Sequence, residues 1–137
     1  MVYLSLGSNL GDRALHLAQA RMMLQNNLDV RFLCYPIVET KADGFFKGDA
    51  PDFLNQLVAF SARDTDISPH RLLGLIKIVE TTLGRPNHTI EYDSEGHRIY
   101  SNRIIDIDII RYDSVTMDSP DLTIPHPVHF DIPKIIL

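Results

Sequence analysis

Short apolar runs in the first part of the chain predict a strand, a helix and a second strand. Val2–Leu6 (VYLSL) is typical of a strand, and residues 7–9 (GSN) are expected to end it. A stretch rich in Ala, Leu and Met, from Asp12 to about Asn26, predicts a helix. The apolar run Val30–Val38 predicts another strand. Pro36 within that run indicates an edge position or a bulge, because proline donates no hydrogen bond to a neighbouring strand.

The middle of the chain predicts a loop followed by a strand. Residues 41–51 (KADGFFKGDAP) combine two glycines and a proline with two adjacent phenylalanines. Aromatic side chains in an exposed loop indicate a lid or a ligand contact, although they can equally pack against the protein. Residues 53–61 (FLNQLVAFS) predict a strand.

A second helix is predicted from its two ends and its apolar spacing. Ser68 followed by Pro69 is a typical helix start, and Gly84 is expected to end the helix. Four apolar residues between these points share one helical face: Leu72, Ile76, Val79 and Leu83.

The last third predicts a polar loop or hairpin over residues 87–102, a strand over Ile104–Tyr112 and a turn region over Asp113–Pro120. Strands and helices therefore interleave, but several connections are too short for parallel crossovers. The expected fold class is α+β, with two helices on one face of a mostly antiparallel sheet. The chain shows no internal repeat or domain boundary, which predicts a single domain over residues 1–137.

Composition and charge narrow the class of protein. The hydrophobic fraction of 45% and the charged fraction of 23% are ordinary for a globular domain. No apolar run approaches the ~20 residues that span a bilayer, and the N-terminus lacks the pattern of a signal peptide. The only cysteine, Cys34, allows no internal disulfide, in agreement with a cytoplasmic location. A net charge of −5 argues against nucleic-acid or membrane-surface partners, but it permits an anionic small ligand held by local arginines or metal ions.

Two aspartates interrupt the apolar strand near residue 107 and are the strongest candidates for chemistry. Asp106 and Asp108 share one strand face, with Cα atoms about 6–7 Å apart. Like charges at that distance repel unless a cation lies between them, and oxygen ligands of this kind suit Mg²⁺ together with phosphate. Arg103 is placed to bind a phosphate. In isolation, the same D-x-D motif also describes a solvated strand face that bears two acids.

Other candidate residues are weaker when taken singly. Residues 7–11 (GSNLG) look like a phosphate loop, but no lysine follows, and a tight strand-to-helix turn is the better interpretation. Glu80 and Arg85 lie at the end of the second predicted helix, where they can form an ordinary charge pair. His126, between two prolines, is either a phosphate contact or a packing residue. No histidine has zinc-ligand spacing with Cys34.

Taken together, five motifs resemble the 6-hydroxymethyl-7,8-dihydropterin pyrophosphokinase family. They are LSLGSNLGDR near the N-terminus, PDFLN at 51–55, LL…VETTLGR ending at Arg85, RIIDIDII at 103–110 and IPHP at 124–127. Their order and approximate spacing match the family from about Val2 to His126. The R-x-x-D-x-D-I element with a downstream P-H is the most specific of the five.

The resemblance implies a ferredoxin-like α+β sandwich and an ATP-dependent enzyme of folate biosynthesis. Such an enzyme moves pyrophosphate from ATP to 6-hydroxymethyl-7,8-dihydropterin and releases AMP, with two Mg²⁺ ions expected and a monomeric state. The pterin hydroxyl would attack the β-phosphorus, and catalysis would consist mostly of positioning and charge neutralisation. Gly44 matches a glycine of the pterin-side loop, so residues 44–50 would form a lid that excludes water.

The resemblance also assigns roles to individual residues. Asp106 and Asp108 match the Mg²⁺ ligands, and Arg85 and Arg103 match arginines that help to bind and transfer the pyrophosphate. The positions that match nucleotide contacts are Glu80, Arg85, Arg103, Ile109, Thr123 and His126. The positions that match the pterin pocket are Thr40, Asp43, Phe53 and Asn55. Phe53 would shape or stack on the pterin ring, and Asn55 would hydrogen-bond its edge.

Several positions depart from the family pattern. Ile132 and Lys134 stand where an arginine and an aromatic residue are usual, and Lys77 and Asn87 replace a common glutamine and arginine. The chain stops at Leu137, whereas family members usually continue, so a missing C-terminal portion is expected. These departures leave open a second hypothesis, a catalytically weak homologue that binds nucleotide or pterin as a regulatory module. A third class, a ferredoxin-like RNA-binding domain, is disfavoured by the acidic charge.

Overall fold

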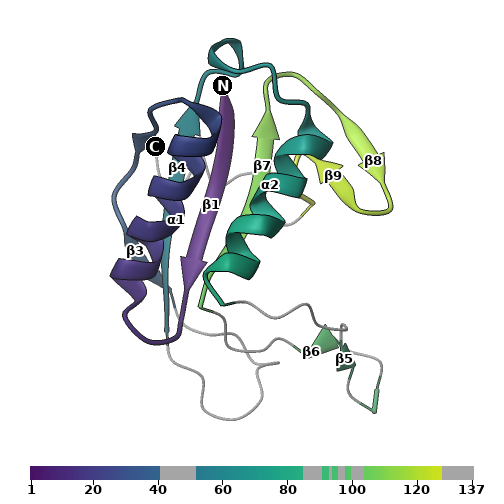
Figure 1. Ribbon diagram of the computed structural model, residues 1–137. Coiled ribbons are helices and arrows are strands. Elements are labelled where there is room, and N and C mark those ends of the chain that lie inside the picture. Colours follow the sequence, from purple (N-terminus) through teal and green to yellow (C-terminus); the bar gives the residue numbers. More distant parts are fainter. Residues whose placement is uncertain (41–51, 85–90, 93, 96–97, 100–103, 128–137) are drawn as a thin grey trace.

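The structure is a computed structural model that describes residues 1–40, 52–84, 91–92, 94–95, 98–99 and 104–127 (Figure 1). Two helices, α1 (Arg13–Leu28) and α2 (Pro69–Thr82), alternate with strands, and a short 3-10 helix covers Ala62–Asp64. The strands are β1 (Val2–Ser8), β2 (Leu33–Cys34), β3 (Val38–Thr40), β4 (Phe53–Phe60), β5 (Glu91–Tyr92), β6 (Arg98–Ile99), β7 (Asp106–Tyr112), β8 (Met117–Ser119) and β9 (Leu122–Ile124).

The main sheet is antiparallel and has the order β2-β4-β1-β7, with β3 pairing alongside β2 on the same edge of β4. If β2 and β3 are counted as one interrupted strand, the chain runs β-α-β-β-α-β with spatial order 2-3-1-4. This arrangement is two interleaved split β-α-β units, as in ferredoxin-like folds. The predicted α+β sandwich is therefore confirmed.

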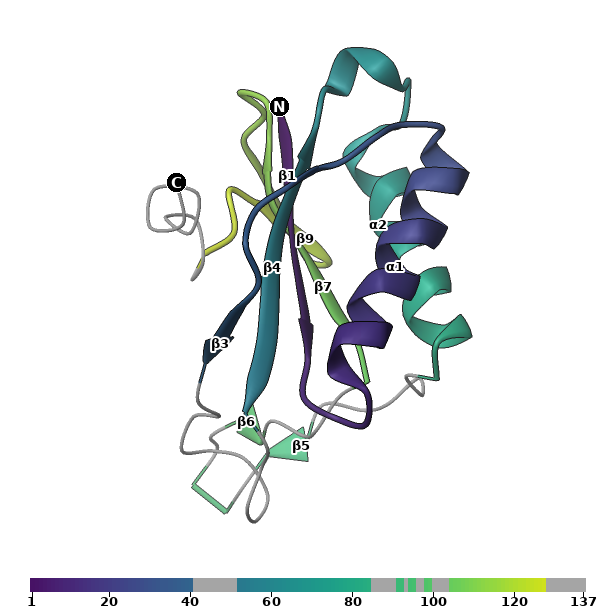
Figure 2. The ribbon, with the colours of Figure 1, turned by 90° about the vertical axis from the view of Figure 1, so that its left-hand side faces the viewer.

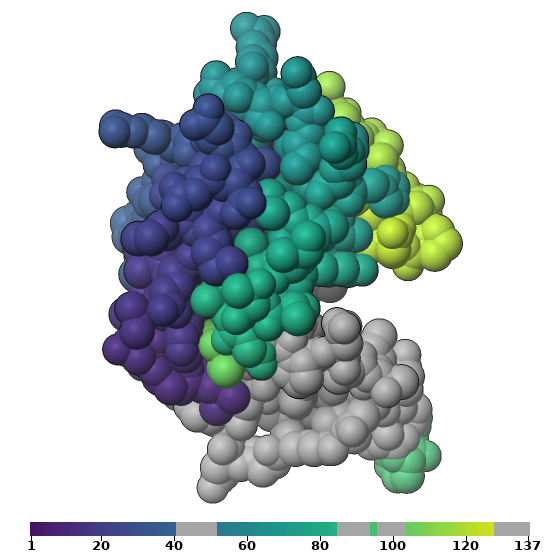
Figure 3. All heavy atoms as spheres, in the orientation of Figure 1, coloured from purple at the N-terminus to yellow at the C-terminus, as the bar shows by residue number. Residues whose placement is uncertain are grey.

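Both helices cover the same face of the sheet (Figure 2). Their side chains close that face of the molecule, and the β8–β9 hairpin lies beside α2 (Figure 3). The core between the helices and the sheet combines alternate residues of β1, β4 and β7 with the apolar faces of α1 and α2. Its largest fully buried members include Leu4, Leu6, Leu17, Leu24, Phe60, Leu72, Ile76, Ile105 and Ile124. Because β1 gives Val2, Leu4 and Leu6 to this core, its intervening residues lie on the face that the two helices do not cover, which is called the open face below.

Both helices begin as the sequence predicts. The side chain of Asp12 accepts a hydrogen bond from the Leu15 amide at 3.1 Å, and Ser68 does the same for Arg71 at 3.3 Å, with Pro69 in the first helical position. Gly84 follows α2 with a φ of +109°, which glycine adopts without strain. Within the described residues, neither helix combines the length and apolarity needed to cross a bilayer.

Three predicted boundaries differ from the observed ones. Strand β1 runs through Gly7 to Ser8, because both residues pair with β4 instead of turning. The single strand predicted over Val30–Val38 is two short strands, interrupted at residues 35–37 around Pro36. The region predicted as turns over Asp113–Pro120 contributes β8 to a hairpin with β9. The polar segment at 87–102 contains the β5–β6 hairpin, one of its two predicted forms.

A polar cluster of Ser119, Asp121 and His70 joins the β8–β9 turn to the start of α2. The Ser119 hydroxyl donates to Asp121 Oδ1 at 2.9 Å, and His70 Nε2 lies 3.1 Å from the same oxygen. These contacts, the serine first and the histidine second, lower the pKa of the Asp121 carboxyl below its ordinary 3.8. The carboxylate therefore stabilises the folded state above pH 3.8, and this contribution is lost as the pH falls through the lower folded-state pKa.

Asp121→Asn is accordingly expected to lower the melting temperature at neutral pH and to have no effect in strong acid, where the wild-type carboxyl is also protonated. Melting curves of both proteins across the acid range measure the difference. The same substitution at the exposed Asp66 is the control for a general charge effect. A difference between wild type and Asp121→Asn that is constant with pH would contradict this account.

Candidate active site

Part of the predicted site lies on the open face of the sheet, at the end where β1 finishes and β4 and β7 begin. Strand β1 is central here: Gly7 lies opposite Asn55 on β4 and opposite Asp106 on β7, and Ser5 lies opposite Asp108. Residues directly opposite in neighbouring strands project to the same face. The register therefore places Asn55 and the carboxylate pair on one surface. Their Cα atoms are separated by two strand spacings, about 10 Å.

The carboxylate pair is arranged as the alternation predicts. Asp106 and Asp108 are half-buried on the open face. Ile105, just before the pair, and Ile107, between its members, are buried against the helices. The His126 imidazole lies beside the pair, with Nε2 3.9 Å from Asp108 Oδ1. A backbone hydrogen bond from the His126 amide to the Ile110 carbonyl, at 2.9 Å, fixes the chain at that point. Residues 18 positions apart in sequence thus meet at one edge of the site.

The carboxylate pair fits magnesium. Its donors are oxygens on a rigid strand, and Mg²⁺ usually takes one or two protein carboxylates and completes its octahedron with water and phosphate oxygens. Among the described residues, no group of three or more His, Cys, Asp and Glu forms a cage of protein ligands. A two-carboxylate site of this kind leaves coordination positions for a nucleotide, which a closed structural site does not.

Three of the predicted pterin residues, Thr40, Phe53 and Asn55, also come together. Asn55 Nδ2 donates to Thr40 Oγ1 at 2.5 Å, and Thr40 lies opposite Phe53 across the β3–β4 ladder. The Asn55 amide is thereby held by a residue on the neighbouring strand. Phe53 is half-buried on the same face, so an aromatic surface and an oriented amide lie side by side. Such a pairing of a ring face with a hydrogen-bonding amide suits a flat heterocycle.

Arg13, at the start of α1, contacts the chain on both sides of the segment 41–51. Its guanidinium donates to the Asp52 carbonyl at 2.6 Å and to Glu39 Oε1 at 3.1 Å. These two bonds hold the end of β3 and the start of β4 against the helix that begins beside the site.

Gly7, which the sequence predicts as part of a turn, lies in the sheet between two groups of predicted site residues. A Cβ built on it would lie 3.0 Å from Asn55 Oδ1 and 3.5 Å from Phe53 Cδ1. The absence of a side chain at Gly7 therefore leaves room for Asn55 and Phe53. Gly7 itself lies between these two predicted pterin residues and the carboxylate pair. The signal in the sequence was the alternation in VYLSLG, which puts Tyr3, Ser5 and Gly7 on the face opposite the core.

Comparison with protein families gives a match to the model for 7,8-dihydro-6-hydroxymethylpterin-pyrophosphokinase (HPPK) over residues 3–132. The chain belongs to the HPPK family. A 2-amino-4-hydroxy-6-hydroxymethyldihydropteridine pyrophosphokinase of Porphyromonas gingivalis is 37% identical over 129 residues, which cover 93% of this chain and 80% of that protein. The Bacillus subtilis protein of the same name is 30% identical over 93% of this chain and 68% of its own length.

A longer HPPK relative is the folic acid synthesis protein FOL1 of Dictyostelium discoideum. It is 31% identical over all 137 residues of this chain, which correspond to 19% of that protein. The family resemblance seen in the five sequence motifs is therefore confirmed, and so is the expected class of ATP-dependent pyrophosphokinase.

The remaining nucleotide-side residues expected in an HPPK lie in different environments. Thr123 is half-buried on β9, 3.5 Å from Asp118 Oδ1 through its hydroxyl. The Ile109 side chain is buried in the core, so a nucleotide could contact only the backbone of this residue. Glu80 is buried in the last turn of α2, where it accepts a hydrogen bond from the Ile107 amide. Asp43, Arg85 and Arg103, the predicted lid at residues 44–50, and the substituted positions Ile132 and Lys134 lie outside the described residues.

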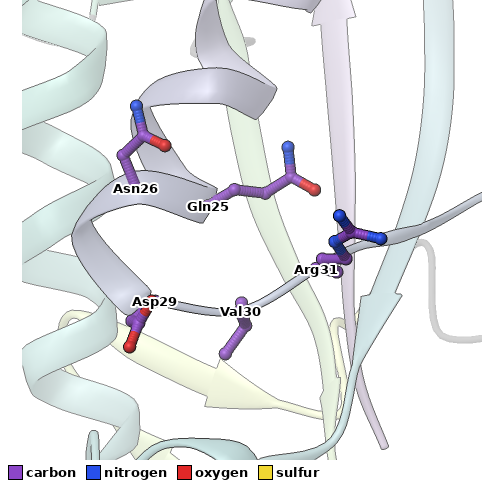
Figure 4. A pocket seen from close by; sticks show the side chains of 5 residues that line it. All are labelled: Gln25, Asn26, Asp29, Val30 and Arg31. Carbon is purple, nitrogen blue, oxygen red and sulfur yellow. The ribbon is translucent and has the colours of Figure 1, made fainter.

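A separate surface hollow of about 610 Å³ lies at the C-terminal end of α1 (Figure 4). Its lining residues are Gln25, Asn26, Asp29, Val30 and Arg31. Since α1 begins beside the candidate site and runs back along the sheet, this hollow lies at the opposite end of the sheet from that site (Figure 1). It takes no part in the site.

Proposed function

We propose that this chain transfers pyrophosphate from ATP to 6-hydroxymethyl-7,8-dihydropterin, giving AMP and the pterin diphosphate for folate synthesis. Membership of the HPPK family supports the reaction. The structural observation that carries it is the strand register, in which Gly7 separates Asn55 from Asp106 on one open face. A pterin held at Asn55 and a metal–phosphate group held at Asp106 are then close enough to react.

The reaction needs one bond to form and one to break. The pterin hydroxymethyl oxygen bonds to the β-phosphorus, the bond from that phosphorus to the α,β-bridging oxygen breaks, and the bridging oxygen leaves with AMP. The hydroxyl proton is released. Since no covalent intermediate with the protein is needed, catalysis rests on alignment of the two substrates and on neutralisation of phosphate charge.

In this proposal each group of residues has one task. Thr40 holds the Asn55 amide so that it binds the edge of the pterin, and Phe53 offers its ring face. Asp106 and Asp108 would hold Mg²⁺, with two ions expected alongside ATP, and bound Mg²⁺ supplies positive charge that neutralises the phosphate oxygens. His126, beside Asp108, is proposed to contact a phosphate oxygen. Arg85 and Arg103 are proposed to bind the transferred group, and Asp43 to complete the pterin pocket.

The test is a chromatographic assay of nucleotide products. With ATP, Mg²⁺ and 6-hydroxymethyl-7,8-dihydropterin, AMP is expected to form in proportion to pterin consumed, without ADP. Omission of the pterin should stop AMP formation, and α,β-methylene-ATP, whose α,β bridge cannot be cleaved, should give none. ADP as the product, or AMP released without pterin, would contradict pyrophosphoryl transfer.

The alternative of a binding module without turnover makes a different prediction in the same assay. Such a protein would bind Mg²⁺ with the ATP analogue, measurable by calorimetry, and yet form no AMP. Relatives named as pyrophosphokinases over most of their length support the active enzyme. The cytoplasmic location, the monomeric state and the single domain over residues 1–137 stay predictions. Light scattering on a sizing column tests the monomer.

A further inference from the structure

Glu80 is an acidic residue buried at the junction of α2 and β7. Its side chain is 8% exposed, and Oε2 accepts a hydrogen bond from the backbone amide of Ile107 at 3.0 Å. The two residues are 27 positions apart in the sequence. Ile107 is the residue between the two site carboxylates, Asp106 and Asp108.

The location of Glu80 is unfavourable for a carboxylate unless its contacts offset the cost. Burial removes solvation from the charged form. In addition, the last turn of a helix carries partial negative charge on its free carbonyls, which disfavours an acid there. The last turn of α2 contains no basic residue. A hydrogen bond from a backbone amide to a carboxylate is charge-assisted and is among the contacts that offset such a cost.

This contact fixes the backbone at the carboxylate pair. The Ile107 amide belongs to the peptide unit that also contains the Asp106 carbonyl, so orienting the amide orients the plane next to the Asp106 Cα. Amides of successive residues in an antiparallel strand point alternately toward and away from the partner. The Ile107 amide points toward Glu80, away from β1, on which Gly7 and Ser5 pair with Asp106 and Asp108. Strand β7 is thus held from both sides at the site.

We infer that Glu80 is a positioning residue for the carboxylate pair, acting through the Ile107 amide and not as a direct ligand of the nucleotide. This inference rests on the proposed function, because it assumes that Asp106 and Asp108 hold the metal. It replaces the nucleotide contact that the family resemblance implied for this position with a different role. Outer residues of this kind, which orient metal ligands, typically contribute 10–100-fold to metal affinity.

Three substitutions separate this role from others. Glu80→Gln keeps an acceptor oxygen at the same reach and removes the charge. Glu80→Met fills a similar volume without a comparable acceptor. Glu80→Asp keeps the charge but is one methylene too short to reach the Ile107 amide. A positioning role predicts that Gln resembles wild type and that Met and Asp are impaired, whereas a direct electrostatic role for the carboxylate predicts that Gln is impaired.

The measurements are the affinity for Mn²⁺ in the presence of α,β-methylene-ATP, by electron paramagnetic resonance, and the hydrogen exchange rate of the Ile107 amide, by NMR. We expect Glu80→Gln to keep the wild-type affinity within about twofold. Glu80→Met and Glu80→Asp should lose about tenfold, with faster exchange at Ile107. Arg71→Met, on the exposed side of the same helix, is the matched control and should change neither quantity.

Two outcomes would overturn the inference. If Glu80→Gln loses as much affinity as Glu80→Met, the charge itself is required. If Glu80→Met and Glu80→Asp melt at a lower temperature but bind Mn²⁺ and nucleotide normally, the hydrogen bond between Glu80 and the Ile107 amide stabilises the fold without positioning the metal ligands. Should Glu80→Met fail to fold, Glu80→Asp provides the same comparison. Wild-type protein that binds Mn²⁺ and nucleotide without forming AMP would refute the proposed function and leave this binding test intact.

Discussion

Asp106→Asn is expected to reduce AMP formation about 10³-fold, which is the largest effect predicted for any substitution here. The amide keeps the size of the carboxylate but removes the charge that a magnesium ion requires, so the transferred phosphates lose their main source of neutralisation. The fold should remain intact. Two like-charged carboxylates on one strand face, with Cα atoms about 6–7 Å apart, repel each other in the absence of metal, so the metal-free variant should melt at or above the wild-type temperature.

Initial-rate assays of AMP formation and melting curves without metal measure these two effects. Asp66→Asn, an exposed aspartate between β4 and α2, is the control and should leave both unchanged. An Asp106→Asn protein that turns over at the wild-type rate would refute the metal assignment. A variant with reduced melting temperature and lost activity would instead indicate that Asp106 is mainly structural.

Gly7→Ala is expected to raise the KM for the pterin about tenfold while leaving the affinity for Mg²⁺ and nucleotide unchanged. The added methyl group would lie 3.0 Å from Asn55 Oδ1, so the Asn55 amide must shift, and we expect its bond to Thr40 to weaken. A displaced hydrogen-bonding group of this kind typically costs about 1–3 kcal/mol in recognition, or about five- to 150-fold in affinity. The end of the Asn55 side chain can shift cheaply, so stability should change by less than about 1 kcal/mol.

Gly74→Ala is the matched control for this experiment. Gly74 is exposed in the interior of α2, and a Cβ there meets nothing within 4 Å. The substitution should stabilise the protein by about 0.5–1 kcal/mol through helix propensity and leave the pterin KM unchanged. Steady-state kinetics at saturating ATP and chemical denaturation measure both. A Gly7→Ala enzyme with normal pterin KM would contradict the role given to Gly7.

The repeating patterns in the sequence predicted the fold well, because burial on one face dominates the choice of structure. The alternation around Asp106 and Asp108 correctly placed both acids on the open face. The Ser68–Pro69 start correctly placed α2. The extension of β1 through Gly7 was missed. A Gly-Ser-Asn sequence is locally typical of a turn, and only pairing with β4 on one side and β7 on the other keeps Gly7 in the sheet.

The candidate site was predicted from motifs, and contacts between distant segments supplied what motifs could not. The resemblance placed Thr40, Asn55 and His126 among the site residues, and the structure brings Thr40 to Asn55 and His126 to Asp108. Neither contact was predictable from spacing along the chain, because each depends on strand pairing. The same holds for Glu80, which the sequence offered as part of a helix-end charge pair and the resemblance as a nucleotide contact. Its contact with the Ile107 amide arises from the packing of α2 on β7.

The direction of β1 has a consequence for how this domain can be joined to other proteins. Because β1 runs toward the site, Met1 lies at the far end of the sheet, where it bonds to Asp113 (Figure 1). A protein attached ahead of Met1 would therefore join the domain at the end away from the candidate site. Relatives such as the Dictyostelium protein, in which the matching segment is 19% of the chain, carry this domain within a longer polypeptide. For laboratory work, the same geometry favours an N-terminal tag for immobilising the enzyme on a sensor surface.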